Sequence, residues 1–158
     1  MPAIEMLVSL KVPDNVAITA FSTLKRMGYA DLVKLERSDY YKFDISNDAE
    51  KFKKEISNVD ILVNANKHKF SFSLEKTKNN DKNKAHRKIN VLVQDLDNGS
   101  GLLPTLRERL GFDNIKNMER GILWALYFEK AADAEKIATD ITKNLLMNGN
   151  YQKFRILR

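Results

Sequence analysis

An internal repeat limits the possible folds of this sequence more than any other feature. Met27-Gly28-Tyr29, then spaced apolar residues and Glu36-Arg37, return 83 positions later as Leu110-Gly111-Phe112 and Glu119-Arg120. Leu62-Val63-Asn64-Ala65-Asn66 is matched in the same way by Leu146-Met147-Asn148-Gly149-Asn150. Repetition over such a distance predicts two copies of one small fold in tandem. We therefore expect function to depend on how the two copies pack together.

Composition excludes several classes of protein. The 158 residues suffice for one ordinary domain or two small ones. The chain has no cysteine, which excludes disulfides, thiolate chemistry and zinc–thiolate sites. No apolar run approaches the roughly 20 residues of a membrane-spanning helix, and Met1–Leu10 has no basic region typical of a secretory signal. These features predict a cytoplasmic protein, because the cytoplasm is reducing.

The basic charge is concentrated in one stretch. The formal net charge is +6 and the pI is about 9.4, but much of the excess lies between Lys76 and Lys88. Thr77–His86 is rich in asparagine and lysine and nearly free of apolar residues, which predicts a solvated linker. The expected organisation is therefore a first repeat at 1–75, a linker at 76–86 and a second repeat at 87–158.

Hydrophobic periodicity predicts the same order of elements in both halves. The first half reads as a strand at 4–10, a helix from Asp14 to Met27, a long strand at 32–45, a helix after Asp48 and a strand at 69–74. The second half reads as a strand at 89–93, a helix at 103–110, a long strand at 115–128, a helix at 137–145 and a strand at 151–157. The predicted class is α+β, with two tandem β-α-β-α-β repeats. Each would be a two-layer sandwich of an antiparallel sheet with two helices on one face, and the two would pack as a pseudo-dimer.

The second long strand is apolar on both faces, as in strands that are covered on both sides. Its outward set is Leu123, Ala125 and Tyr127, where the first half has Tyr40, Lys42 and Asp44. Two interpretations remain open. The sheets of the two copies could stack within the chain, or this face could be an interface with another subunit or partner.

Short motifs in both halves resemble the small PurS subunit of phosphoribosylformylglycinamidine synthase. In the first half they are Ser9-Leu10-Lys11, Gly28-Tyr29, Leu32, Leu35 and Tyr40, and in the second they are Gly121, Leu145-Leu146-Met147-Asn148 and the strand at 151–157. The chain is thus similar to a tandem PurS over nearly its whole length. It departs from the family pattern at Glu36, Asp39, Glu119 and Ile122, and it lacks the family's Asp-Pro-Gln-Gly motif.

The resemblance implies a non-catalytic assembly subunit in de novo purine biosynthesis. Such a subunit bridges a synthetase and a glutaminase so that ammonia passes between them, within an ATP- and glutamine-dependent ligase complex. Its expected partners are those two subunits, together with self-association as a fused pseudo-dimer or a dimer of it. We expect no catalytic residues, no cofactor and no contact with a membrane or with nucleic acid.

Few residues qualify as site candidates. The interface candidates are Leu123, Ala125, Tyr127 and the recurring pairs Glu36-Arg37 and Glu119-Arg120, although such charges are often only locally paired. Gly99-Ser100-Gly101 precedes a helix and could offer N–H groups to an anion, but no phosphate-binding lysine follows. His68 and His86 are the only histidines and are too isolated to predict a metal site.

Two other functions stay open. A tandem regulatory domain could bind a small molecule through the turn at 99–101, on fold-level analogy alone. An RNA-binding protein would combine basic charge with a sheet and two helices, but no RNP-type motif is present.

Overall fold

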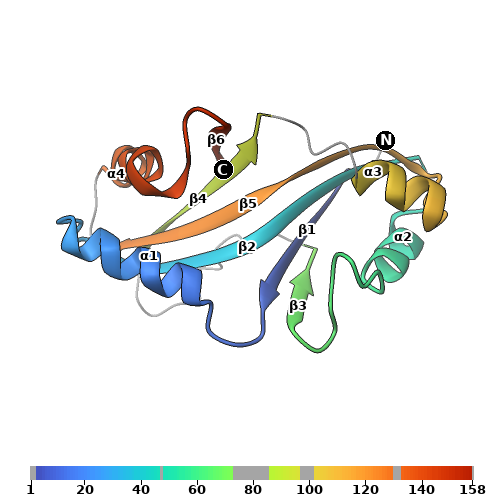
Figure 1. Ribbon diagram of the computed structural model, residues 1–158, viewed down its shortest axis with the longest axis horizontal. Helices are drawn as coiled ribbons and strands as arrows, with labels where there is room; N and C mark the ends of the chain where they lie inside the picture. The colour runs from blue at the N-terminus through green and yellow to red at the C-terminus, as the bar shows by residue number, and fades with distance from the viewer. Residues whose placement is uncertain (1–2, 47, 73–85, 97–101, 130–132, 158) are drawn as a thin grey trace. The chain divides into compact units, whose positions relative to one another are not determined.

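The computed structural model describes residues 3–46, 48–72, 86–96, 102–129 and 133–157. In this part of the chain the fold is α+β, with a six-stranded antiparallel sheet and four helices (Figure 1). The six strands are β1 (Ala3–Leu10), β2 (Leu32–Ile45), β3 (His68–Ser71), β4 (His86–Asp95), β5 (Ile115–Glu129) and β6 (Gln152–Leu157). The helices are α1 (Asn15–Arg26), α2 (Ala49–Ile56), α3 (Leu102–Pro104) and α4 (Ala134–Ile141). Two π-helical segments extend α3 and α4, namely η1 (Thr105–Arg109) and η2 (Thr142–Leu146).

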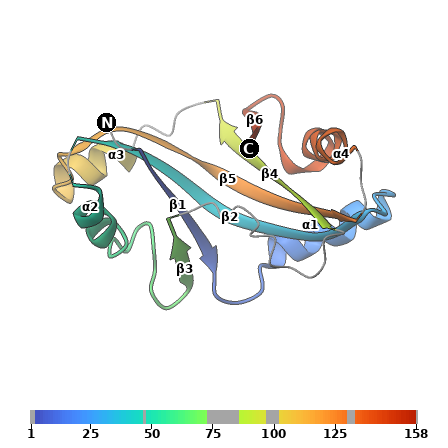
Figure 2. The same ribbon diagram turned by 180° about the vertical axis from the view of Figure 1, so that it is seen from behind.

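All six strands belong to one sheet, in the order β3-β1-β2-β5-β4-β6. The expectation that two sheets stack face to face is therefore wrong for the described residues. β2 and β5 are the central strands, and each is hydrogen-bonded to a strand on both sides. Neither therefore presents unpaired main-chain groups at a sheet edge. Both views show β3 beside β1, in agreement with the pairing of Val8 with Phe70 (Figures 1 and 2).

The hairpins of the two halves share one register. Val8 lies opposite Asp39 and Phe70 in the first half, and Val93 lies opposite Ile122 and Phe154 in the second. These are equivalent positions of the repeat that the sequence predicts. A slip of one residue in the pairing would turn every side chain to the other face of the sheet. Because the register is shared, the alternating apolar residues of β1 and β4 point to the core in both hairpins.

The chain divides into two compact units, and each takes segments from both halves of the sequence. Unit 1 consists of Met1–Val12, Asp39–Leu74 and Asp97–Gly121. Its core joins side chains of β1, β2 and α2 to Leu106 and Phe112 of the second half. Phe52 makes edge-on ring contacts with Phe43, at 5.3 Å between centroids, and with Phe112, at 6.0 Å. The core residues of unit 1 are Ile4, Met6, Val8, Tyr41, Phe43, Ile45, Phe52, Ile56, Leu62, Val63, Leu106, Phe112 and Ile115.

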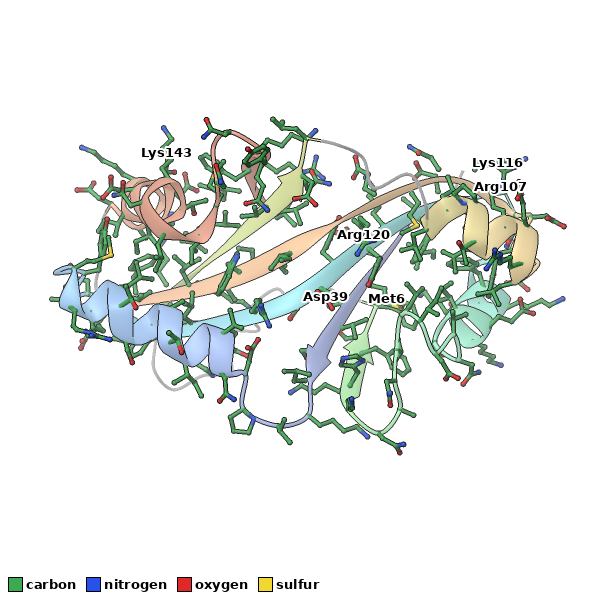
Figure 3. The ribbon with its side chains drawn as sticks, viewed as in Figure 1. Met6, Asp39, Arg107, Lys116, Arg120 and Lys143 are labelled. Carbon is green, nitrogen blue, oxygen red and sulfur yellow. The ribbon has the colours of Figure 1, made fainter. Side chains whose placement is uncertain are left out.

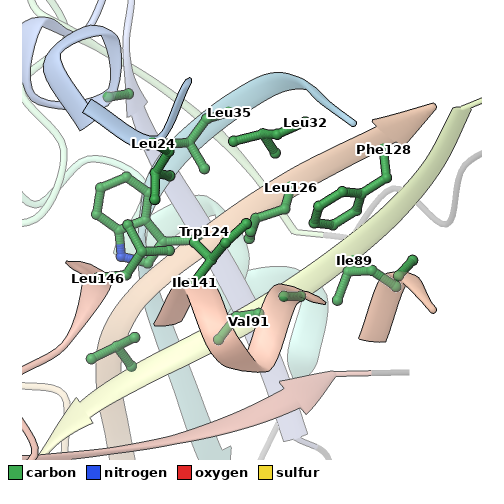
Figure 4. Close-up of a cluster of buried hydrophobic side chains, with 14 residues drawn as sticks. Leu24, Leu32, Leu35, Ile89, Val91, Trp124, Leu126, Phe128, Ile141 and Leu146 are labelled. Atoms are coloured by element: carbon green, nitrogen blue, oxygen red, sulfur yellow. The ribbon is translucent and has the colours of Figure 1, made fainter. Parts of the chain in front are cut away.

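Unit 2 consists of Pro13–Ser38, Glu75–Leu96 and Ile122–Arg158. Leu24 of α1, from the first half, is buried among strands and helices of the second half (Figure 4). Ala17 of the same helix belongs to this core as well. Helices α1 and α4 thus share one core with β4 and β5. The core residues of unit 2 are Ala17, Leu24, Leu32, Leu35, Ile89, Val91, Val93, Trp124, Leu126, Phe128, Ala134, Ala138, Ile141 and Leu146.

The long strands explain this exchange of helices. The first part of β2 belongs to unit 2 and the rest to unit 1, whereas β5 runs from unit 1 into unit 2. Helix α1 leads into the first part of β2 in unit 2, and η1 leads into the first part of β5 in unit 1. The compact units therefore cut across the predicted repeats at 1–75 and 87–158, whose boundaries stay predictions. Residues 76–85 of the predicted linker lie outside the described residues.

Helices α1 and α2 each begin directly after an aspartate that caps them. The Asp14 carboxylate accepts hydrogen bonds from the N–H groups of Val16 and Ala17 at the start of α1. Asp48 accepts in the same way from Glu50 and Lys51 at the start of α2. Both aspartates satisfy main-chain donors that have no partner within the helix.

The last turn of the fourth helix differs from prediction. The apolar stripe predicts that Leu145 follows Ile141 on the buried side, but Leu145 is exposed and Leu146 is buried. The N–H of Met147 donates to the carbonyl of Thr142, five residues back. This wider π-type turn changes which leucine faces the core.

Candidate protein–protein interface

The three apolar interface candidates of β5 lie in unit 2, on the face of the sheet opposite the helices. Trp124, Leu126 and Phe128 point into the core of unit 2 under α1 and α4. Because side chains alternate along a strand, Leu123, Ala125 and Tyr127 point to the opposite side. Leu123 is buried, whereas Ala125 and Tyr127 are half-buried. None of the three is fully exposed.

Pairing with β4 and β6 defines the neighbours of these residues. Lys88 lies opposite Tyr127, Asn90 lies between Ala125 and Leu157, and Leu92 lies between Leu123 and Arg155. Directly opposed residues of antiparallel strands share a face. We call this surface the helix-free face of unit 2. Its residues are Lys34, Glu36, Lys88, Asn90, Leu92, Gln94, Leu123, Ala125, Tyr127, Glu129, Lys153, Arg155 and Leu157.

A charged cluster surrounds the ring of Tyr127. The Nζ atoms of Lys34 and Lys88 lie 5.2 Å and 5.5 Å from the centre of the ring, within the range of cation–π attraction. Lys34 also forms an ion pair with Glu36 at 3.2 Å. Burial raises the pKa of Glu36, but hydrogen bonds from Tyr127 and Lys34 and the charges of both lysines outweigh it, so this pKa lies below its ordinary value. The cluster therefore keeps Glu36 ionised and fixes the position of Tyr127.

Asn90 is a polar residue in the middle of this face, next to the pair of Leu92 and Arg155. Its Oδ1 atom is buried and has no hydrogen-bond partner among the described residues. An acceptor left in this state costs roughly 1–3 kcal/mol. Such a group calls for a specific explanation, which can be a water or a partner that supplies a donor.

Arg37 has a structural role. Its Nε atom lies 2.9 Å from Oδ2 of Asp14, and a second bond of 3.2 Å joins Nη2 to Oδ1. The same aspartate caps α1, so Arg37 ties the start of this helix to β2 within unit 2. Glu119 and Arg120 belong to β5 in unit 1, where Arg120 is exposed (Figure 3). Burial and Asp39 raise the pKa of Tyr41, whereas the positive charge of Arg120 opposes that rise.

The remaining sequence candidates do not form a site in the described residues. Gly99, Ser100 and Gly101 lie outside them. Nδ1 of His68 accepts the N–H of Asn64 at 3.0 Å, so this histidine closes a turn. No group of three histidine, aspartate or glutamate side chains in the described part of the chain is placed to hold a metal ion. No helix in this part is long and apolar enough to cross a membrane.

A depression in unit 2 was not predicted from the sequence. It has a volume of about 690 Å³ and lies between the turn at 28–32 and α4 with η2. The Tyr29 hydroxyl donates to Oδ2 of Asp140 at 2.7 Å and accepts from Nδ2 of Asn144 at 3.0 Å. The bond to Asp140 raises the pKa of Tyr29, because it favours the protonated phenol. Charged side chains on its wall are Asp31, Asp133, Lys136, Asp140 and Lys143.

Comparison with protein-family models, with curated proteins and with solved structures gave no match for this chain.

Proposed function

We propose that this chain is a non-catalytic assembly subunit of phosphoribosylformylglycinamidine synthase, built as a tandem PurS-like repeat that packs as a pseudo-dimer. In this role it bridges the synthetase and glutaminase subunits, so that ammonia released from glutamine reaches the ATP-dependent amination site. The observation that carries the proposal is the sharing of both hydrophobic cores between the two halves of the sequence. Two copies that complete each other's cores are what a fused dimer of a small subunit requires.

Matching local geometry supports the tandem part of the proposal. Asn64 and Asn148 each accept the N–H of the residue two positions on, at 3.0 Å in both turns. Each of these asparagines also donates its own N–H to a side chain four residues later, His68 in one turn and Gln152 in the other. The equivalent strand register of the two halves also supports a tandem repeat.

The helix-free face of unit 2 supports an assembly role. It presents half-buried apolar residues, namely Ala125, Tyr127 and Leu157, beside exposed cations on β6. Tyrosine and arginine are enriched where proteins bind one another, and this face carries Tyr127 and Arg155.

The proposal is tested by separating the two sources of ammonia. The synthetase and glutaminase subunits of the same organism are purified and assayed with and without this chain, once with glutamine and once with ammonium salt. We expect the chain to be required for amination with glutamine and to have little effect with ammonium. Native mass spectrometry with glutamine and Mg-ADP present should show a ternary complex only when the chain is added. Equal glutamine-dependent rates with and without the chain would contradict the proposal.

The depression beside Tyr29 favours a second candidate, a small-molecule sensor. Carboxylates and lysines on one wall could hold a zwitterionic metabolite such as an amino acid. A ligand that binds only the folded chain raises its Tm, and the rise grows with the logarithm of ligand concentration above Kd. A screen of amino acids and nucleotides by thermal shift, repeated with Lys136→Ala, tests this candidate.

A further inference from the structure

The sheet has two edge strands in the described part of the chain, β3 and β6. β3 has four residues, whereas β6 has six, which pair continuously with β4 from Gln152 to Leu157. Very short strands, bulges and prolines are devices that protect a sheet edge from further pairing. β6 has no bulge in its register and no proline in its sequence. The backbone of β6 is therefore able to pair with another strand on its outer side.

The main-chain hydrogen bonds of β6 show which of its residues face outward. The N–H of Leu96 donates to the carbonyl of Tyr151 at 2.8 Å, just before β6 begins. Along antiparallel strands, pairs that exchange hydrogen bonds alternate with pairs that do not. Counted from Tyr151, Phe154 and Ile156 fall on positions that do not bond to β4. Their N–H and C=O groups consequently point away from β4, toward the open edge.

The side chains of β6 make the two sides of this edge chemically different. Phe154 and Ile156 pack against the core of unit 2, on the side of the sheet that α1 and α4 cover, and are half-buried. Lys153 and Arg155 alternate with them and stand on the helix-free face, where both are exposed. The residues of β4 directly opposite these two cations carry no charge. The edge is therefore apolar on one side and cationic on the other.

The carboxylate of Asp95 lies beside the start of β6 but on the apolar side. Asp95 stands opposite Gln152, and its Oδ1 atom accepts a hydrogen bond from Nε2 of that residue at 3.0 Å. Alternation along β4 places Asp95 on the same side as the buried Val93, away from Lys153. Lys153 forms no ion pair with a carboxylate of the described residues. A carboxylate of a partner would therefore bind favourably beside this lysine.

We propose that β6 binds an extended segment of another protein as a further strand of the sheet, and that this segment alternates acidic with apolar residues. Opposed side chains of paired strands share a face. The acidic residues would thus lie beside Lys153 and Arg155, and the apolar residues beside Phe154 and Ile156. In strand addition, main-chain hydrogen bonds give affinity and the alternating side chains give specificity. This contact is defined by the chemistry of the edge and does not depend on the proposed function.

A second copy of the chain fits this edge less well. Lys69 of β3 is exposed and alternates with Phe70, which lies opposite the buried Val8, so β3 has the same two sides as β6. Pairing two such edges would set cations against cations or against apolar side chains. Like charges directly opposite each other destabilise paired strands.

A displayed library of random peptides, each about twice as long as β6 and selected against the full chain, tests the chemistry of the partner. We expect the enriched peptides to alternate acidic with apolar residues, and we expect their binding to weaken as the salt concentration rises. Selection of peptides without this alternation, or of none above background, would overturn the proposal.

Hydrogen exchange at single amides locates the bound peptide. In the free chain the N–H groups of Phe154 and Ile156 should exchange faster than those of Lys153 and Arg155, which bond to β4. A saturating selected peptide should slow exchange at Phe154 and Ile156 about tenfold or more, and far more than at the other two. Equal slowing at all four amides, or slowing confined to the depression beside Tyr29, would contradict strand addition.

Two variants of one residue separate the main chain of β6 from its side chains. Ile156→Pro removes an outward N–H and keeps the bonds to β4, since an edge strand tolerates proline where its nitrogen faces outward. It should weaken binding of a selected peptide about tenfold or more. Ile156→Ala is the matched control, because it shortens the side chain and keeps the N–H, and it should weaken binding less. An equal loss in both variants would mean that the main chain takes no part.

Charge reversal tests the cationic side of the edge without altering the main chain. Lys153→Glu combined with Arg155→Glu should weaken binding about tenfold or more and should turn a new selection toward basic peptides. The control combines Lys136→Glu with Lys143→Glu, since both lysines are exposed but lie on α4 and η2 in the helical layer (Figure 3). An equal loss of binding in the two double variants would overturn the assignment to β6.

Discussion

Gly28 and Gly111 occupy the turns through which a helix leads into a long strand. Their φ angles are +102° and +76°, in the left-handed region that disfavours residues with a Cβ. A Cβ added at either position would meet no atom within 4 Å. Any loss of stability on substitution should therefore come from the backbone alone.

We predict that Gly28→Ala and Gly111→Ala each lower the free energy of unfolding by about 1 kcal/mol, because alanine pays a penalty in this conformation. Urea unfolding followed by circular dichroism measures the effect. Gly149→Ala is the matched control, since Gly149 also has open space around it but no positive φ. If all three variants unfold at the same urea concentration, the turns do not require glycine.

Glu36 allows a prediction of pH dependence at a single residue. Its pKa lies below the ordinary value, since the bonds from Tyr127 and Lys34 and the lysine charges outweigh burial. A carboxyl group with a lowered folded-state pKa adds stability above its unfolded pKa of ~4.3, and this is lost as the pH falls through the folded value. Glu36→Gln should thus cost stability at pH 7 and almost none below about pH 3.

The measurement for Glu36 is the difference in unfolding free energy between the unaltered chain and the variant across this range. Glu108→Gln serves as the control, because Glu108 is exposed and lacks an ion-pair partner among the described residues. If the difference in unfolding free energy between the unaltered chain and Glu36→Gln does not change with pH, the charged cluster around Tyr127 does not stabilise ionised Glu36.

At the scale of elements, local signals in the sequence place strands and helices well. Alternating residues mark β1 and β4, and the predicted span 32–45 coincides with β2. Asp14 and Asp48 mark helix starts by chemistry that acts within a few residues. An amphipathic stripe, however, states only that one face of a helix is buried and not which sheet covers it. For this reason the sequence did not predict that α1 completes the core of the second half.

The exchange of helices predicts crossed effects of core substitutions. Leu24→Ala in α1 should destabilise unit 2 by about 2–5 kcal/mol, because Leu24 is fully buried there. Hydrogen exchange should accelerate in β4 and in the second part of β5, far along the sequence. Leu106→Ala, in the second half, should accelerate hydrogen exchange in β1 and α2 of the first half.

The control for this pair is Ile18→Ala, since Ile18 lies on α1 but is 51% exposed. It should change exchange rates only slightly. Acceleration confined to the half of the sequence that carries each substitution would show that the cores are not shared.

At the scale of the whole molecule, the candidate interface shows why a site is harder to predict than a fold. The apolar character of Leu123, Ala125 and Tyr127 indicated a covered face, and the sequence left open what covers it. Lys88, Asn90 and Arg155 join this face only through strand pairing across 35 to 67 residues of sequence. Periodicity within one strand carries no information on such distant neighbours. The depression beside Tyr29 was missed for the same reason, as its walls come from two distant segments.

The sharing of both cores makes a final prediction about the chain as a whole. A protease site inserted within 76–86 and cut after folding should leave two fragments that stay together, because each core contains buried residues of both fragments. The cut protein should elute as a 1:1 complex, and its Tm should rise with protein concentration, since unfolding now also separates two chains. The uncut protein with the same insertion, whose Tm should not depend on concentration, is the control. If the fragments separate under native conditions and each keeps its helical circular dichroism, each half folds on its own. That result would contradict the proposed pseudo-dimer.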